Sequence, residues 1–153
     1  MHIRTLMSAD YPIIDSYMQE LHALHVQNRP DLFLPADHIY SEQDFFEITT
    51  GNQHIALAME DSGFIAGFLI AALRTKSNMV SGPLTIYVDD LFVHPDYRGQ
   101  HIATALFDEM EQQAKSLKAV RIDLMVWEFN EAAQELYKSL GMTAQRYIFE
   151  KSL

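Results

Sequence analysis

The chain contains 153 residues, of which 48% are hydrophobic and 21% are charged, as in an ordinary globular protein. This length suits one domain, residues 1–153, with a core large enough to fold by itself. The net charge of −10 argues against general nucleic-acid binding, which requires a basic surface. Because the chain has no cysteine, the sequence excludes disulfides and thiolate metal ligands.

Neither the N-terminus nor the apolar segments indicate a membrane or secreted protein. The longest apolar stretch, 64–73, is far shorter than the ~20 residues of a membrane span, and Met1-His2-Ile3-Arg4 lacks a signal-peptide pattern. We therefore expect a cytoplasmic protein with no membrane partner. The acidic balance would attract a cationic ligand, although an acidic surface can also serve solubility alone.

Hydrophobic periodicity and turn residues divide the chain into strands and helices, without repeats or linkers. Strands are predicted at 3–7, 54–59, 64–74, 84–93, 120–127 and 147–150. Four helices are predicted. The first runs from the N-cap Ser8 to before Pro30, and the second runs from the N-cap Ser41 to about Thr49. The third spans 102–117, and the fourth runs from the N-cap Asn130 to Leu140, with Gly141 as the helix stop. The segments 28–38, 61–63 and 78–82 are predicted as a loop, a hairpin turn and a loop. The order β-α-α-β-β-β-α-β-α-β indicates a mixed α/β layer fold.

The segment from Val93 to Ala103 joins the strand at 84–93 to the helix at 102–117. A strand that leads through a loop into a helix N-terminus makes an anion site, because free backbone N–H groups and the helix dipole converge there. Gly99 and Ala103 are small enough to allow a phosphate to approach closely, and Arg98 can add a charge-assisted hydrogen bond. By itself this pattern is also compatible with an ordinary turn.

A longer motif makes the phosphate interpretation specific. The stretch Leu91-Phe92-Val93-His94-Pro95-Asp96-Tyr97-Arg98-Gly99-Gln100-His101-Ile102-Ala103 resembles the pyrophosphate loop of the GCN5-related N-acetyltransferases (GNAT), which move acetyl from acetyl-CoA to an amine. The family's loop reads Arg/Gln-x-x-Gly-x-Gly/Ala, so His101 stands where the family has glycine. If His101 has a negative φ, its side chain is tolerated, whereas a positive φ makes histidine an uncommon residue there. Its imidazole can either bond a phosphate oxygen or face solvent.

The resemblance covers essentially the whole chain and implies the GNAT fold, a mixed, mostly antiparallel twisted sheet flanked by helices. It also implies acetyl-CoA as the cofactor. The residues that would bind it are Leu91, Phe92, Val93, Arg98, Gly99, Gln100, His101, Ile102, Ala103, Asn130 and Tyr137.

Two adjacent aspartates interrupt the strand before the loop, and a carboxylate inside an apolar strand is costly unless it is solvated, paired or functional. Regular alternation places Tyr87, Asp89, Leu91 and Val93 on one face, and Val88, Asp90 and Phe92 on the other. The strand resembles that of spermidine/spermine acetyltransferases, which implies that Asp89 faces the acceptor amine. Asp90 is expected to be structural, paired with a backbone or basic group. The alternative for Asp89 is a solvated carboxylate beside a cleft.

The chemistry of amine acetylation gives Asp89 a role. An alkyl amine with a pKa near ~10 is mostly protonated at neutral pH, and only its neutral form attacks a thioester. A carboxylate can bind the cation and accept its proton, directly or through water. Backbone N–H groups of the strand can bind the developing oxyanion. Since the chain has no cysteine, direct transfer in a ternary complex is favoured over an acetyl-cysteine route.

The stretch from Trp127 to Met142 follows the family's strand–Asn–helix–Tyr–Gly pattern. An N-cap position alone explains Asn130, and the resemblance adds a hydrogen bond to the pantetheine region of CoA. By spacing, Tyr137 is a core-facing aromatic residue whose hydroxyl needs a partner. The resemblance implies that Tyr137 lies beside the cofactor sulfur and protonates the departing thiolate.

The first two helices and the loop between them usually shape the acceptor pocket in this family. Acidic and aromatic side chains, which suit a cationic amine, occur there at Asp15, Tyr17, Glu20, Asp31, Phe33, Asp37, Tyr40, Phe45 and Phe46. His22 and His25 lie three residues apart, but no third ligand is evident. Helix packing is therefore favoured over a metal site, and no metal is expected.

The sequence thus predicts an N-acetyltransferase that acts on a primary amine of a small cationic acceptor, with acetyl-CoA and this amine as partners. Because dimers are common in the family, a homodimer is also considered. One alternative is acetylation of protein N-termini or lysines. An alternative of another class is a non-catalytic CoA-binding sensor, for which His101 is the only support.

Overall fold

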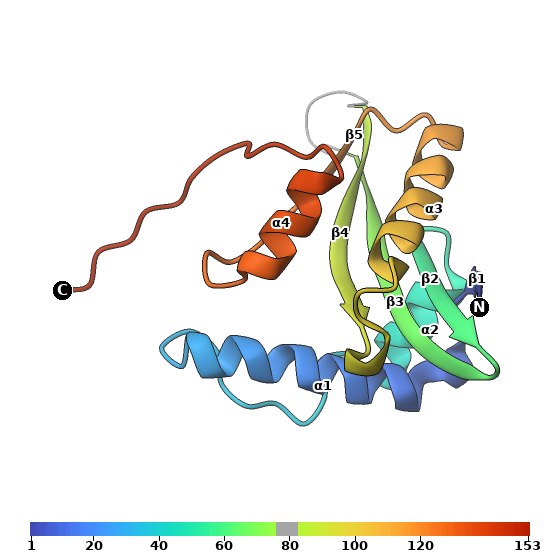
Figure 1. The fold of residues 1–153 in the computed structure, drawn as a ribbon, viewed down its shortest axis with the longest axis horizontal. Helices are drawn as coiled ribbons and strands as arrows, with labels where there is room; N and C mark the ends of the chain where they lie inside the picture. Colours follow the sequence, from blue (N-terminus) through green and yellow to red (C-terminus); the bar gives the residue numbers. More distant parts are fainter. Residues whose placement is uncertain (76–82) are drawn as a thin grey trace.

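The computed structural model describes residues 1–75 and 83–153, so the loop predicted at 78–82 lies outside the described residues. Five strands form one sheet in the order β1-β2-β3-β4-β5 (Figure 1). Their bounds are β1 His2–Thr5, β2 His54–Asp61, β3 Phe64–Thr75, β4 Leu84–Val93 and β5 Arg121–Leu124. The first four strands are antiparallel, and β5 is parallel to β4.

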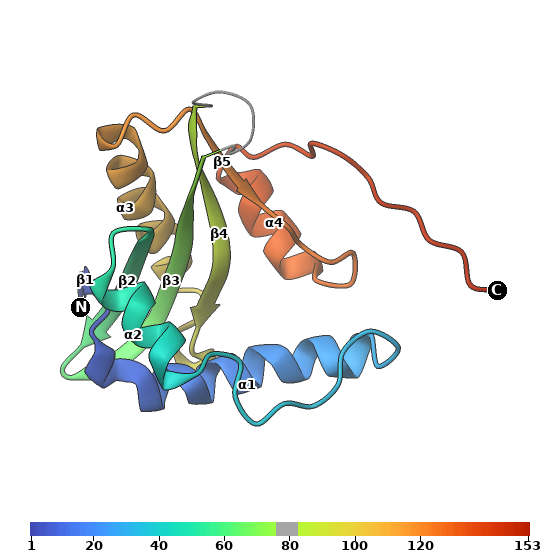
Figure 2. The same cartoon turned by 180° about the vertical axis from the view of Figure 1, so that it is seen from behind.

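Four α-helices flank the sheet, with bounds α1 Tyr11–Asn28, α2 Glu42–Thr50, α3 Ile102–Ser116 and α4 Glu131–Ser139. Two one-turn 3₁₀ helices, η1 Ser8–Asp10 and η2 Pro95–Tyr97, precede α1 and follow β4. Figure 1 shows α3 in front of the sheet, and Figure 2, from behind, shows α2 on the opposite face. This mixed, mostly antiparallel sheet with helices on both faces confirms the predicted fold class.

Two apolar clusters hold these layers together, one on each face of the sheet. Leu106 and Met110 of α3 pack with Ile86 and Val88 of β4 in the first cluster. The second cluster joins α1 and α2 to the other face, through Ile14, Tyr17, Met18, Phe45, Ile48, Phe68 and Phe92. Because β4 contributes to both clusters, its side chains are fixed from both sides.

The helix ends mostly follow the predicted capping residues. The N–H of Asp44 donates to the Ser41 hydroxyl at 3.0 Å, and the N–H of Ala133 donates to the Asn130 side chain at 3.2 Å. Gly141 ends α4 with a φ of 81°, which a residue without Cβ adopts at little cost. The prediction for Ser8 is wrong: α1 begins at Tyr11 after η1, and the Ser8 hydroxyl bonds that of Thr49 instead.

A β-bulge in β4 changes which side chains share a face. The register with β3 shifts between Ile70 and Ala71, so that Ile70 pairs with Asp90 and Ala71 pairs with Val88. Asp89 is the extra residue, and the alternation restarts beyond it. Val88 and Phe92 consequently lie in different core clusters, although regular alternation would put them on one face. The predicted assignment of faces is therefore wrong across this strand.

The C-terminal end also differs from the prediction. β5 is shorter than the predicted 120–127, because its ladder with β4 ends at the pair Val88–Leu124. The predicted strand at 147–150 is wrong for the single chain: residues 143–153 are extended, belong to no strand and run away from the sheet (Figures 1 and 2). The apolar pattern favours a strand, but a strand also needs a neighbouring edge for its backbone groups.

Within residues 1–75 and 83–153, no helix combines the length and apolar character that crossing a bilayer requires.

Candidate active site

The site begins where β4 and β5 separate. Beyond the pair Val88–Leu124, β5 has no further residue in the ladder, whereas β4 continues to Val93. β3 occupies the other edge of β4 as far as the pair Gly67–Val93. From Asp89 to Val93, β4 therefore has no strand partner on the side of β5. This segment includes the predicted binding residues Leu91, Phe92 and Val93. An extended ligand can hydrogen-bond to such an edge.

The loop after β4 presents a run of free backbone donors. Among the described residues, no backbone or side-chain acceptor receives the N–H groups of Gly99 to Thr104, and the first helical bond of α3 is that from Ala105 to the His101 carbonyl. The run includes Gln100, Ile102 and Ala103, whose role in cofactor binding stays a prediction. Free N–H groups at a helix N-terminus carry partial positive charge and favour an anion.

His101 and Gly99 give this loop its shape. His101 has φ 59° and ψ 19°, which is the left-handed conformation, and Gly99 has φ 77°. His101 is thus the uncommon case of a side chain at a glycine-like position, which histidine tolerates better than most residues. A Cβ added at Gly99 would meet no atom within 4 Å, so the glycine is needed there for its φ and not for space.

Arg98 lies at the start of the same loop. Its Nε donates to the Val93 carbonyl at 3.2 Å, and its Nη2 lies 3.7 Å from a carboxylate oxygen of Glu20 in α1. Both side chains are about half exposed, so this ion pair is weak. The guanidinium therefore stays available to a phosphate bound at the loop.

The carboxylate of Asp90 lies on the side of β4 that faces α4 and the 29–40 loop. It accepts a 2.5 Å hydrogen bond from the Tyr40 hydroxyl, an interaction across 50 residues of sequence. Burial raises the pKa of Asp90 to about 6, the Tyr40 hydrogen bond opposes this rise, and the charge of Asp89 adds to it. Asp90 was expected to pair with a backbone or basic group, so Tyr40 is a partner that the sequence analysis missed.

Tyr137 of α4 is partly buried and near enough to Asp90 to sense its charge. Burial raises the pKa of Tyr137 to about 12, and the negative charge of Asp90 contributes to the rise. The described residues provide no hydrogen-bond partner for its hydroxyl. A phenol in this state stays protonated at neutral pH and has its proton available for transfer.

Asp89 has a different environment. Its Oδ1 lies 3.3 Å from Nη2 of Arg74, whose guanidinium stacks 3.5 Å from the centre of the Tyr87 ring. Burial raises the pKa of Asp89, and the nearby charge of Arg74 opposes the rise. Asp89 thus has a basic partner, whereas the charge of Asp90 is the one that raises the pKa of Tyr137.

The residues predicted for the acceptor side differ in their burial and contacts. Tyr17 and Phe45 are buried in the core. The side chain of Asp15 is also mostly buried, and its Oδ2 accepts hydrogen bonds from Gln19 and from His38 at 3.0 and 2.8 Å. Phe33 of the loop packs edge-on against Trp127.

The two histidines of α1 serve packing and local hydrogen bonds. His22 donates to the Leu34 carbonyl, and His25 donates to the Leu21 carbonyl while its ring contacts Phe33 and Phe129. No group of three or more metal-ligating side chains occurs in the described parts of the chain.

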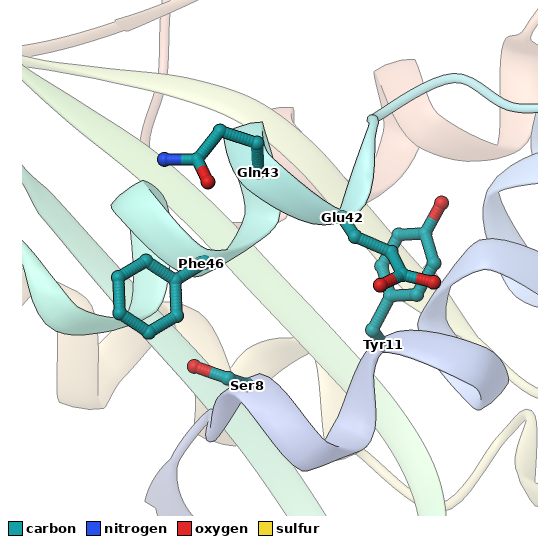
Figure 3. A pocket seen from close by; sticks show the side chains of 5 residues that line it. All are labelled: Ser8, Tyr11, Glu42, Gln43 and Phe46. Atoms are coloured by element: carbon teal, nitrogen blue, oxygen red, sulfur yellow. The ribbon is translucent and has the colours of Figure 1, made fainter.

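A separate hollow lies between the start of α1 and helix α2 (Figure 3). Ser8 and Tyr11 line it from one side, and Glu42, Gln43 and Phe46 line it from α2. None of the residues predicted to bind cofactor or to catalyse is among them. The hollow is linked to the site only indirectly, because the Tyr11 hydroxyl donates to the Tyr40 carbonyl at 2.8 Å.

Comparison with known proteins identifies the family to which this geometry belongs. The sequence model of the acetyltransferase (GNAT) family matches residues 18–142, which is most of the chain. The chain belongs to the GNAT acetyltransferase family. Acetyl-CoA is the acetyl donor of this family, so the predicted family, fold and cofactor are confirmed.

Relatives of this GNAT chain are similar over different spans. A thialysine N-epsilon-acetyltransferase of Bos taurus is 36% identical over 56 residues, which cover 37% of this chain and 33% of that protein. The match thus spans about a third of the length of the curated relatives. A mutant of the BH1408 protein from Bacillus halodurans has a TM-score of 0.94 at 26% identity, covering 100% of this chain and 99% of that one. An aminoglycoside N-acetyltransferase in complex with CoA has a TM-score of 0.67 at 17% identity, covering 99% of both chains, which is a likeness of fold.

Proposed function

We propose that this protein is a single-domain N-acetyltransferase that transfers acetyl from acetyl-CoA to a primary amine of a small, cationic acceptor. One observation carries the proposal. Asp90, whose pKa is raised to about 6, and Tyr137, whose hydroxyl lacks a partner among the described residues, lie near each other where β4 separates from β5. A base and an acid in one region of the molecule are what amine acetylation requires.

The chain's own groups fit acetyl-CoA. The free N–H groups from Gly99 to Thr104 and the Arg98 guanidinium would hold its pyrophosphate, and the open edge of β4 at Leu91 to Val93 would hold its pantetheine arm. Asn130, at the N-terminus of α4, would add a side-chain contact. Bound acetyl-CoA supplies an acetyl group activated as a thioester.

Asp90 prepares the amine for attack. An alkyl ammonium with a pKa near ~10 must lose a proton before it can react. With a pKa of about 6, Asp90 is ionised at neutral pH and is a stronger base than an ordinary aspartate. It binds the cation and accepts its proton, directly or through a water molecule. The choice of Asp89 for this role stays a prediction, and its contact with Arg74 makes it the weaker candidate.

Tyr137 supplies a proton on the leaving-group side. Its pKa of about 12 keeps the hydroxyl protonated at neutral pH, and a thiolate that leaves nearby can receive this proton. Because the chain has no cysteine, the acetyl group passes directly to the amine in a ternary complex.

Charge supports a cationic acceptor. The net charge of −10 attracts a positively charged amine toward the protein. The thialysine acetyltransferase of Bos taurus, which matches part of this chain, is named for an amine of this kind. Asp89 and Asp90 place two carboxylates on neighbouring residues of β4, where they favour a cation.

The test is release of thiol from acetyl-CoA with a panel of polyamines, thialysine, aminoglycosides and short peptides. We expect turnover with at least one small amine and a lower kcat/KM with every peptide. Turnover with peptides alone would show that the acceptor is a protein and not a small amine. Binding of CoA without turnover of any amine would instead establish a non-catalytic sensor.

A further inference from the structure

One face of α1 is hydrogen-bonded to the 29–40 loop that follows this helix. The polar side chains on this face are spaced by four, four and three residues, so they form a single stripe along the helix: Tyr11, Asp15, Gln19 and His22. The loop turns back along α1 before the chain enters α2 (Figures 1 and 2). The stripe therefore meets the residues of the loop in reverse order, from 40 back to 34.

The two ends of the stripe bond to backbone carbonyls of the loop. The Tyr11 hydroxyl donates to the Tyr40 carbonyl at 2.8 Å, and Nε2 of His22 donates to the Leu34 carbonyl at 2.8 Å. Because a carbonyl belongs to the main chain, these bonds fix the path of the loop and not only the position of a side chain. The segment from 34 to 40 is thus held at both ends.

The middle of the stripe holds the loop through Asp15 and Gln19. Nε2 of Gln19 donates to the Asp37 carbonyl at 2.7 Å, and His38 donates to Oδ2 of Asp15 at 2.8 Å. The Asp15 side chain is mostly buried, and its Oδ1 has no hydrogen-bond partner among the described residues. An unbonded carboxylate oxygen inside the fold costs free energy. Asp15 therefore does more for the position of the loop than for the stability of the fold.

Tyr40 connects this loop to the candidate site. Tyr11 holds its carbonyl and its hydroxyl donates to Asp90 at 2.5 Å, so Tyr40 is fixed at its main chain and at the end of its side chain. Its ring packs against the second apolar cluster. The other ionisable groups near Asp90, which are Asp89 of β4 and Tyr137 of α4, make no hydrogen bond to it among the described residues. The donor to Asp90 is therefore the residue that the stripe on α1 holds in place.

We propose that the residues of this stripe are positioning residues of the site, which hold the loop so that the Tyr40 hydroxyl stays on the Asp90 carboxylate. When a bond of the stripe is lost, the loop has fewer fixed points and the hydrogen bond to Asp90 is made for less of the time. Tyr11 has the largest share, because it bonds to Tyr40 itself. The catalytic consequence rests on the proposed role of Asp90 as the base, whereas the positioning of Tyr40 does not.

The first experiment needs no turnover. In protein labelled with ¹³C at the aspartate carboxyl carbon, NMR follows the titration of Asp90, whose signal is the one missing from Asp90→Asn. Tyr11→Phe keeps the ring and removes only the hydroxyl that holds the Tyr40 carbonyl, so the pKa of Asp90 should rise by about half a pH unit. The matched control is Tyr17→Phe, since this hydroxyl of the same helix donates to the Ile65 carbonyl at 2.8 Å. It should leave the pKa of Asp90 in place. An unchanged pKa in Tyr11→Phe would overturn the proposal.

The second experiment asks whether Tyr11 acts through the Tyr40 hydroxyl. In Tyr40→Phe this hydroxyl is absent, so adding Tyr11→Phe should shift neither the pKa of Asp90 nor the acid limb of the kcat/KM profile any further. A Tyr11 with only a structural role would add its own shift, and that result would overturn the proposal. A pKa of Asp90 that rises in Tyr11→Phe while the acid limb stays in place would support the positioning and would remove Asp90 as the base of the proposed function.

Discussion

The two sides of the candidate site are built from different parts of the chain. On the loop side, the donors are backbone N–H groups from Gly99 to Thr104, and His101 has a left-handed backbone at the position where the family motif has glycine. On the proton side, the proposed base Asp90, its hydrogen-bond partner Tyr40 and the proposed acid Tyr137 are single side chains. The two sides should therefore tolerate substitution differently, because backbone donors survive a change of side chain, whereas the function of a proposed base or acid does not.

The largest effect is expected at Asp90. Asp90→Asn keeps the shape of the side chain but removes the base, so kcat/KM should fall about 10³-fold. Asp89→Asn, one residue away in the same strand, is the matched control and should cost less than about tenfold, because Asp89 pairs with Arg74. Steady-state kinetics at pH 7.5 measures both. A greater loss of kcat/KM for Asp89→Asn than for Asp90→Asn would assign the role of general base to Asp89.

Tyr137 should show the next largest effect. Tyr137→Phe removes the hydroxyl proposed to protonate the leaving thiolate, so kcat should fall about 10²-fold. KM for acetyl-CoA should stay within about twofold, because the proposed cofactor contacts come from the loop backbone and not from this hydroxyl. Tyr147→Phe, in the exposed tail, provides a control with unchanged kinetics. If kcat of Tyr137→Phe equals that of the wild type, the proton comes from elsewhere.

Tyr40 should change the pH dependence more than the maximal rate. Its hydroxyl stabilises the ionised form of Asp90 and so limits the rise in the pKa of Asp90, which is about 6 with this hydrogen bond in place. Tyr40→Phe should therefore raise the pKa of Asp90 further. Asp90 must be ionised to act as a base, so the acid limb of the kcat/KM profile should move to higher pH, with several-fold lower activity at pH 6 and little change at pH 8.

The matched control for this profile is Tyr97→Phe. The Tyr97 hydroxyl donates to Asp61 at 3.3 Å, outside the proton side of the site. Its loss should leave the acid limb in place. An unshifted limb in Tyr40→Phe would mean that Asp90 is not the group whose ionisation the profile reports.

The sequence was sufficient wherever the determinants are local. The strand at 84–93, the caps Ser41 and Asn130 and the stop at Gly141 depend on a few neighbouring residues, and the structure has them as predicted. The order of the elements from β1 to α4 followed from hydrophobic periodicity in the same way.

The prediction failed where the determinants are distant in sequence. The bulge at Asp89 depends on the register with Ile70 and Ala71 of β3, and no residue pattern near Asp89 predicts it. The contact between Tyr40 and Asp90 joins a loop to a strand 50 residues away. The pattern at 147–150 correctly indicates an extended, apolar segment, but whether this segment pairs depends on an edge that its own chain does not bring to it.

The smallest effects are expected at His101, where the loop side can be tested directly. At φ 59°, any side chain carries a left-handed conformation that costs roughly 1 kcal/mol, and glycine does not. The His101→Gly protein should thus resist urea better than His101→Ala, by about 1 kcal/mol in the free energy of unfolding. Both variants should keep KM for acetyl-CoA within about threefold, since the donors are backbone N–H groups that neither change removes. A tenfold rise in KM shared by both variants would show that the imidazole itself binds phosphate, and the loop side would then depend on a single side chain as the proton side does.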